Sequence, residues 1–270
     1  MEKKQTLEIL ICTINERIQK VPDVILAPQE NVRYLVSWQQ TGTVKVSLPD
    51  ALKGRDDVRV VALEGKGLSA NRNNALKHAS GDILLLSDDD CRYRPEYLER
   101  IRHNFVKYPL ADFICFRCVD STGNFLKRYA TKPFTYANRP YGAYFSSWEI
   151  AFRRKTSLPF FDERFGLGSR FLACGEEEIF LYSAWKKGLK VIYVPETIVE
   201  TDAHTTGKRF MTYGAVRRSK GAVLCYMYGP LQARLRSLKY VMYLDTDIDS
   251  KRRFFHDMLL GIRYIKNGHF

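Results

Sequence analysis

The sequence predicts an α/β fold with a mainly parallel central sheet. Short runs rich in Val, Ile and Leu alternate with segments of helical spacing, and clusters of Gly, Pro, Asn and Asp separate them. Such alternation is typical of βαβ units, in which helices flank a parallel sheet. With 45% hydrophobic and 27% charged residues in 270 positions, the composition excludes a disordered or fibrous protein.

The first half of the chain is expected to supply four strands and two helices. The predicted strands comprise residues 7–13, 34–38, 58–63 and 82–86. A helix is predicted over residues 68–79, because small and apolar residues recur there at helical spacing before a glycine. A second amphipathic helix is expected to begin at Pro95.

The second half changes to extended segments, at residues 112–119 and 146–153, around a stretch rich in Tyr, Gly and Pro. Residues 176–187 predict a helix, because they are acidic at the start, basic at the end and followed by a glycine. A strand is expected at residues 189–194. From about residue 206 the periodicity is helical, with Arg and Lys on the polar side.

The basic charge is concentrated near the C-terminus. Lys and Arg outnumber Asp and Glu by 13 in the whole chain, and the part after His204 holds 13 Lys or Arg but only four Asp. Such a segment favours polyanions, which are phosphates, nucleic acid or an anionic bilayer surface. Two interpretations stay open: a peripheral contact with a membrane surface, or a set of packing helices with a solvated basic face.

Two absences in the sequence predict the compartment. No apolar run reaches the roughly 18 residues that a membrane-spanning helix needs, and the first residues lack the apolar core of a secretory signal. We therefore expect a cytoplasmic protein, either free or peripheral at the inner membrane face. The six cysteines are then expected to be thiols. Cys115 and Cys118 form a lone CxxC in an apolar run, which favours a strand core over a zinc site.

The sharpest local feature is an apolar strand that ends in Asp88, Asp89 and Asp90. In an open α/β sheet, ligands bind beyond the carboxyl ends of the strands. Three adjacent anions repel one another unless a cation is present. A divalent metal bound to diphosphate oxygens would meet this need, since Mg²⁺ and Mn²⁺ prefer oxygen ligands. The structural alternative is a solvated Asx turn.

Three further segments carry candidate groups. A turn at Gly65 feeds a helix that carries Arg72, and backbone N–H groups together with a guanidinium favour phosphate, although a lone arginine can also be a surface residue. The sequence GEEE at residues 175–178 opens a helix, either as favourable helix electrostatics or with one carboxylate as a general base. His204 is a solitary histidine, either structural or a metal ligand.

In this order the segments resemble the family 2 glycosyltransferases with the A-type nucleotide-sugar-binding fold, over about residues 5–205. The resemblance rests on six pieces, which are a first strand ending in Thr-Ile-Asn-Glu, then GLSANRNNAL, LLLSDDD with a following proline, FDERFG, GEEE and VIYVPETIVETDAH. It implies a Rossmann-like catalytic domain at 1–205, with a nucleotide-sugar-binding half (1–110) and an acceptor-side half (111–205). Residues 206–270 would form a basic, mainly helical C-terminal extension.

The resemblance also implies roles for single residues. Asp88 and Asp90 fall on the DxD positions, with Asp90 as the direct metal ligand and Asp88 nearer the ribose, and His204 completes the metal site. The implied nucleotide-binding residues are Thr13, Asn15, Glu16, Gln39, Arg72, Asp88 and Asp89. Glu177 falls where the family usually has its catalytic Asp, and Glu176 precedes it, so the general base is one of these two glutamates.

The implied reaction moves a sugar, in the manner of a hexosyltransferase, from a UDP- or GDP-sugar to a hydroxyl of a glycan or lipid-linked acceptor. Polysaccharide or surface glycan synthesis is the expected setting. Mn²⁺ or Mg²⁺ would stabilise the departing diphosphate. A single displacement assisted by a general base would invert the anomeric centre.

Two other classes compete with this interpretation. A sugar-1-phosphate nucleotidyltransferase shares the α/β architecture, but it would need a glycine-rich basic loop after the first strand, where this chain has Thr13-Ile-Asn-Glu16. A nucleic-acid-binding protein would explain the basic charge but not the carboxylates at strand and helix ends. We therefore expect no nucleic acid partner.

Overall fold

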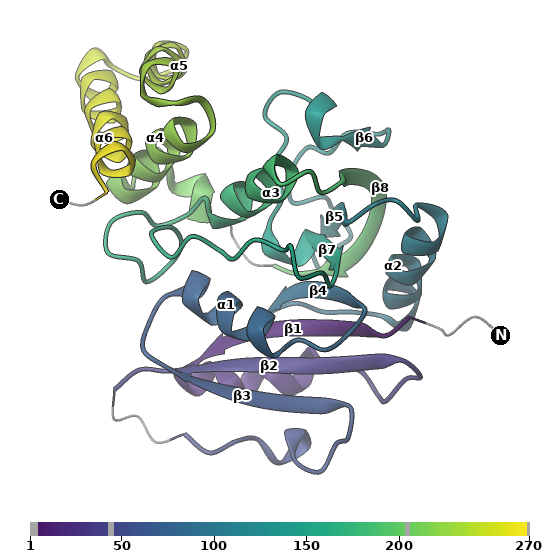
Figure 1. Cartoon of the computed structure of the whole chain (residues 1–270). Helices are drawn as coiled ribbons and strands as arrows, with labels where there is room; N and C mark the ends of the chain where they lie inside the picture. Colours follow the sequence, from purple (N-terminus) through teal and green to yellow (C-terminus); the bar gives the residue numbers. More distant parts are fainter. Residues whose placement is uncertain (1–4, 43–45, 203–205, 269–270) are drawn as a thin grey trace. The chain divides into compact units, whose positions relative to one another are not determined.

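The computed structural model describes residues 5–42, 46–202 and 206–268, and Figure 1 shows the course of the chain. The chain forms two compact units. The first comprises Met1–Lys66, Ala70–Phe160 and Ser183–Ala203, and the second comprises Gly67–Ser69, Phe161–Tyr182 and His204–Phe270. The second unit thus joins the C-terminal residues to a segment from the middle of the chain, and the predicted domain boundary at residue 205 stays a prediction.

A mixed sheet forms the centre of the first unit. Within the described residues it has eight strands, which are β1 (Leu7–Ile14), β2 (Val32–Gln40), β3 (Val58–Glu64), β4 (Ile83–Asp88), β5 (Phe113–Val119), β6 (Phe134–Thr135), β7 (Ile150–Arg153) and β8 (Val191–Glu200). Their spatial order is β3-β2-β1-β4-β7-β5-β8-β6. β7 runs antiparallel between β4 and β5, and β6 runs antiparallel to β8, whereas the other neighbouring pairs are parallel. The predicted mainly parallel α/β sheet is confirmed.

β1 lies between β2 and β4 and sets the edge at which the predicted site residues occur. Its first seven residues are all buried, as expected for a parallel strand covered on both faces. The register places Cys12 of β1 opposite Asp88 of β4, and Ile14 of β1 opposite Gln39 of β2. The carboxyl ends of these three strands therefore lie side by side.

Helices connect the strands of the first unit. α1 (Leu68–His78) joins β3 to β4, and α2 (Pro95–Lys107) joins β4 to β5. α2 begins with a proline, which the first turn tolerates because its N–H would have no helical partner. Leu98, Ile101 and Phe105 of α2 are buried in the main core. The shorter 3₁₀ helices of this unit are η1 (Asn15–Asp23), η2 (Asp50–Leu52), η3 (Tyr136–Asn138) and η4 (Ser147–Glu149).

The second unit is helical. It contains the start of α3 (Glu176–Lys186), then η5 (Thr206–Arg209), α4 (Gly214–Tyr228), α5 (Pro230–Met242) and α6 (Ile248–Asn267). α4 and α6 touch backbone to backbone, because a Cβ on Gly221 would collide with the backbone of Met258 and one on Gly261 with the carbonyl of Arg218. Three residues of the middle segment share a buried cluster with Ala222 of α4; they are Phe165, Leu172 and Ile179.

Most predicted elements are confirmed with small shifts at their ends. The extended segment expected at residues 146–153 is a strand only over β7 (Ile150–Arg153), because a capping box of Ser146 and Glu149 starts the 3₁₀ helix η4 (Ser147–Glu149) before it. β4 extends to Asp88, so the first of the three aspartates belongs to the strand. β8 continues to Glu200 rather than ending near residue 194, because its pairing with β5 resumes after a register shift and reaches Glu200. All six cysteines are free thiols, and five of them are buried. No helix in the described part of the chain is both long and apolar enough to span a membrane.

Candidate active site

Asp88 is the last residue of β4, and buried groups hold its carboxylate. One oxygen lies 3.4 Å from the guanidinium of Arg72 on α1, and the other accepts a hydrogen bond from the Ser147 hydroxyl at 3.3 Å. Arg72 also donates to Ser147 at 2.9 Å, and its side chain is only 2% exposed. A fixed positive charge therefore lies next to the strand-end carboxylate.

The Asp89 side chain is buried and connects the loop after β4 to β1 through a hydrogen bond. Only 2% of its side chain is exposed. It accepts a 2.6 Å hydrogen bond from the Thr13 hydroxyl and a 2.9 Å hydrogen bond from Nε of Arg17. The structure thus gives Asp89 and Thr13, both predicted to contact the nucleotide, contacts with each other.

Asp90 keeps one carboxylate oxygen without a partner. Oδ2 lies 3.2 Å from the guanidinium of Arg17, whereas Oδ1 is buried and accepts no hydrogen bond from the described residues. Burial, together with the negative charges of Asp88 and Asp89, raises the pKa of Asp90. A buried unpaired acceptor is unfavourable unless a donor or a cation reaches it. An oxygen donor of this kind fits Mg²⁺ or Mn²⁺.

The metal site predicted from the sequence stays a prediction. Asp88 and Asp90 lie together at the end of β4, but His204, the third predicted ligand, falls outside the described residues. In the parts of the chain that are described, no three His, Cys, Asp or Glu side chains gather closely enough to hold one ion.

The buried face of α1 is polar, and it fixes Arg72 in place. Asn71 donates to the carbonyl oxygen of Thr13 at 2.9 Å and accepts a hydrogen bond from the Ser37 hydroxyl at 2.6 Å. Asn74 donates to the same hydroxyl at 2.9 Å. α1 is thereby hydrogen-bonded to the ends of β1 and β2, so Arg72 has little freedom to move.

The predicted nucleotide-binding residues around β2 form a second group at the carboxyl ends of the strands. Asn15 adopts a left-handed backbone with φ of +47°, and its amide group makes two hydrogen bonds with Thr41, of 2.7 and 2.8 Å. Its carbonyl oxygen accepts the indole N–H of Trp38 at 3.0 Å. Gln39 is buried within β2, whereas Glu16 is exposed in the first turn of η1.

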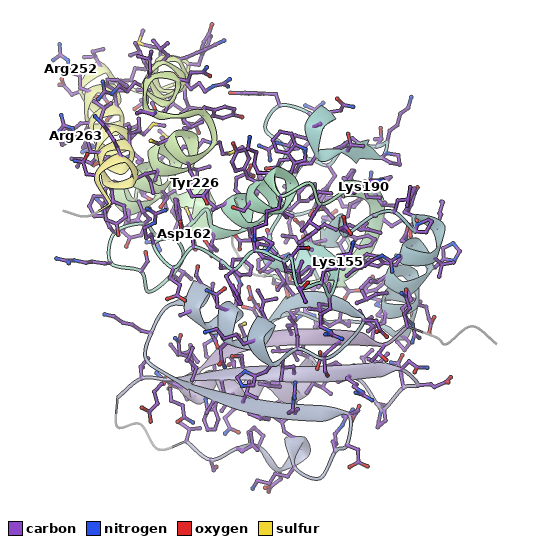
Figure 2. The ribbon with its side chains drawn as sticks, viewed as in Figure 1. Lys155, Asp162, Lys190, Tyr226, Arg252 and Arg263 are labelled. Carbon is purple, nitrogen blue, oxygen red and sulfur yellow. The ribbon has the colours of Figure 1, made fainter. Side chains whose placement is uncertain are left out.

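Glu176 and Glu177 open α3 within the second unit and differ in burial. Glu176 is 4% exposed and packs against Gly166, whose φ is +99° and whose hypothetical Cβ would lie 3.1 Å from Cδ of Glu176. Glu177, by contrast, is half-buried. An ion pair of 2.6 Å between Arg164 and Asp162 stabilises the loop that carries Gly166. Figure 2 labels Asp162 of this pair.

A family model described as glycosyl transferase family 2 matches residues 39–173, which is half of the chain. The chain belongs to glycosyl transferase family 2. It is therefore a glycosyltransferase, and the two competing classes, nucleotidyltransferase and nucleic-acid-binding protein, are not supported. A comparison with the curated proteins found no match.

Solved structures of TarS from S. aureus are similar to this glycosyltransferase. The crystal structure of TarS 1-349 has a TM-score of 0.60 and 13% sequence identity, covering 98% of this chain and 92% of that chain. The complex of TarS 1-349 with UDP-GlcNAc has a TM-score of 0.57 and 13% identity, covering 98% and 93%. A longer TarS structure has a TM-score of 0.55 and 15% identity, covering 96% of this chain but 43% of that chain. At these identities the likeness shows the fold, and the predicted A-type architecture is confirmed.

Arg17 and Ser147 of the glycosyltransferase are site residues that the sequence analysis missed. Arg17 bonds to both Asp89 and Asp90, and its hydrogen bond with Asp89 raises its pKa. Arg17 could have been identified from its position in the first turn after β1, because β1 is the neighbour of β4. Ser147 lies in η4, which a capping box of Ser146 and Glu149 begins, and a sequence pattern does not show that this turn meets Asp88.

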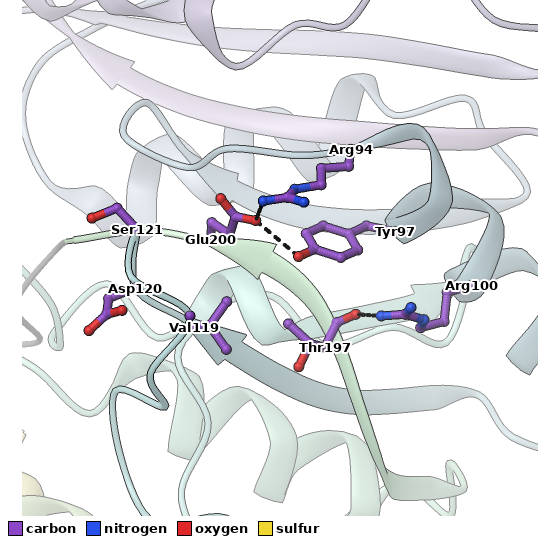
Figure 3. A pocket seen from close by; sticks show the side chains of 9 residues that line it. Arg94, Tyr97, Arg100, Val119, Asp120, Ser121, Thr197 and Glu200 are labelled. Atoms are coloured by element: carbon purple, nitrogen blue, oxygen red, sulfur yellow. Dashed lines mark hydrogen bonds and ion pairs between the residues drawn. The ribbon is translucent and has the colours of Figure 1, made fainter.

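The glycosyltransferase also has a polar pocket of about 320 Å³ between α2 and the ends of β5 and β8 (Figure 3). Glu200 accepts a 3.0 Å hydrogen bond from the Tyr97 hydroxyl and pairs with Arg94 at 2.6 Å. Arg100 donates to the carbonyl oxygen of Thr197. None of the predicted site residues that the structure describes lines this pocket, and its charged groups pair with one another or with the backbone.

Proposed function

We propose that this enzyme is a metal-dependent, inverting glycosyltransferase whose donor is a nucleoside diphosphate sugar bound at the carboxyl ends of β1, β2 and β4. The observation that carries the proposal is the set of aspartates after β4. The buried Oδ1 of Asp90 has no hydrogen-bond partner among the described residues, while the neighbouring Asp88 is 3.4 Å from the buried Arg72. An open carboxylate oxygen and a fixed guanidinium, side by side, suit a cation and the diphosphate that it accompanies.

A uridine nucleotide is the donor that the comparisons support best. The similar TarS has been solved with UDP and with UDP-GlcNAc. In this chain the corner made by Asn15 and Trp38 would receive the nucleoside, and Arg72 would receive the phosphates. Mn²⁺ or Mg²⁺, held by Asp90 and Asp88 with His204, would supply Lewis-acid stabilisation of the leaving diphosphate.

Glu177 is the proposed general base. It would take the proton from the acceptor hydroxyl while that oxygen attacks the anomeric carbon from the face opposite the diphosphate, and this single displacement inverts the anomeric centre. The difference in burial supports Glu177 over Glu176, because Glu176 is packed against Gly166 and Glu177 is the more exposed of the two. The acceptor we propose is a hydroxyl of a glycan or of a lipid-linked glycan.

The test is a thermal-shift panel of UDP, GDP, CDP and ADP, each with and without Mn²⁺. A ligand at 100 times its dissociation constant stabilises the folded state by about 2.7 kcal/mol, which moves the midpoint of a protein of this size by several degrees. We expect a Mn²⁺-dependent shift with UDP that is lost in Asp90→Ala. The matched control is Asp249→Ala on α6, whose carboxylate is 85% exposed. No shift with any nucleotide, or an unchanged shift in Asp90→Ala, would overturn the proposed site.

A further inference from the structure

α5 presents two apolar faces, although only one of them packs against its own unit. Ala233, Ser237 and Val241 form the buried face. The large apolar side chains lie on another side and are exposed; they are Leu231 at 70%, Leu235 at 63%, Leu238 at 46% and Met242 at 57%. Folding of the second unit therefore leaves the larger apolar surface of this helix in solvent.

The exposed residues make one continuous stripe. Their spacing of four, three and four residues places them on a single side of a helix. A single exposed leucine is ordinary on a protein surface, whereas a contiguous apolar patch marks an interaction site. Tyr243, which directly follows α5, is 82% exposed.

The charged residues of α5 itself are all basic. Residues 206–244 contain eight Lys or Arg and no Asp or Glu. Helical spacing places Arg234 on one side of the stripe and Lys239 on the other, and both are exposed. Arg236 lies farther round the helix, with its guanidinium 4.0 Å from the centre of the Tyr228 ring.

From this we infer that α5 docks on an anionic membrane surface, with Leu231, Leu235, Leu238 and Met242 inserted among the lipid headgroups. An apolar stripe flanked by Lys and Arg is the pattern of a helix that lies in the plane of the interface. Anionic lipids attract the flanking cations. A second copy of the chain fits less well, because pairing two stripes would bring Arg234 and Lys239 of each copy together, and α5 itself carries no acidic residue to offset them.

Sedimentation with vesicles tests the docking, using phosphatidylcholine vesicles with and without about 30% of the anionic lipid phosphatidylglycerol. We expect the full chain to pellet with the anionic vesicles and to stay in the supernatant with the neutral ones. Leu231→Ser combined with Leu235→Ser and Leu238→Ser should lower the partition coefficient at least about tenfold. The matched control, Val106→Ser with Leu110→Ser, removes two apolar side chains that are 72% and 71% exposed in the first unit, and it should bind like the wild type.

A charge variant supplies the second arm of the test. Arg234→Gln combined with Lys239→Gln should reduce binding to anionic vesicles by about tenfold or more, because each cation near such a surface contributes about a fivefold gain. Retention of the wild-type partition by the triple serine variant would overturn the inference, as would sedimentation that does not depend on lipid charge. Self-association without lipid that the serine substitutions abolish would also overturn it and assign the stripe to a second copy. The inference does not depend on the proposed donor, because the readout is lipid binding.

Discussion

At the residue scale, Asp90 illustrates how a residue of a proposed binding site can oppose folding. Burial and the charges of Asp88 and Asp89 raise its pKa in the folded protein. For a carboxyl group with a raised folded-state pKa, the stabilising contribution is fully present only below the unfolded pKa of about 3.9, and it is lost as the pH rises through the folded value. At neutral pH the charged side chain is therefore unfavourable for folding, and the proposed cation would offset this cost.

The substitution Asp90→Asn tests whether the charge of Asp90 destabilises the folded protein at neutral pH. Without metal at pH 7, the substitution should raise the thermal midpoint by about 1–2 °C, because it removes one of three adjacent negative charges. The gain should shrink as the pH approaches 4, where the wild-type group becomes protonated. Differential scanning fluorimetry between pH 7 and 4 measures the change in thermal midpoint, with Asp249→Asn as the exposed control. A lower midpoint would mean that the contact between Arg17 and Asp90 outweighs the repulsion.

A second prediction at the residue scale distinguishes the roles of Glu176 and Glu177 at the start of α3. Glu177→Gln should leave the Mn²⁺-dependent UDP shift intact and lower the rate of sugar transfer by two or more orders of magnitude, as expected on loss of a general base. Glu176→Gln should lower transfer much less. A coupled assay of UDP release in the presence of an acceptor measures both variants, and the reverse ranking would assign the base to Glu176.

At the element scale, the sequence was most informative where its patterns were local. The sequence predicted β1 from a run rich in Leu and Ile at residues 7–13, and β4 from an apolar run that ends in acids. The resemblance placed Asp88, Asp90 and Arg72 at the candidate site. Arg17 and Ser147 were missed because their contacts with the aspartates are non-local, separated by 59 to 73 residues in sequence. The polar inner face of α1 was also missed, since a pattern search expects apolar residues on a buried face.

The crossing of α4 and α6 supplies an element-scale prediction. Gly221→Ala should destabilise the protein by about 3 kcal/mol, because the new methyl group would overlap the backbone of Met258, which cannot rotate away as a side chain can. Gly207→Ala is the control, as nothing lies within 4 Å of its hypothetical Cβ. Urea denaturation followed by circular dichroism compares the two. Equal stability of both variants would contradict the close crossing.

At the whole-molecule scale, the two units are not consecutive in sequence. The buried cluster of the second unit combines Phe165, Leu172 and Ile179 with Ala222. Sequence patterns could place a helical region after residue 206, but they could not show that the region shares a core with residues 161–182. Such a partnership depends on long-range packing, which leaves no periodic signal in either segment.

A truncation tests this shared core. A fragment of residues 1–205 should be cleaved rapidly by protease within 161–182, because Phe165, Leu172 and Ile179 lose the helix against which they are buried. The full chain, digested in parallel, should be protected in the same segment. Mass spectrometry of the fragments locates the cuts. Equal protection in both would place the boundary at residue 205, as the sequence analysis expected.

The state of the thiols has a practical consequence for spectroscopy. Burial raises the pKa of Cys12, Cys118 and Cys174 to about 12, so at neutral pH these sulfurs carry almost no thiolate, the form that reacts with maleimides. A single introduced cysteine, such as Tyr243→Cys beside α5, would then react first under mild conditions. A polarity-sensitive fluorophore attached there would report the depth of that position in a lipid headgroup layer, with the native cysteines left in place.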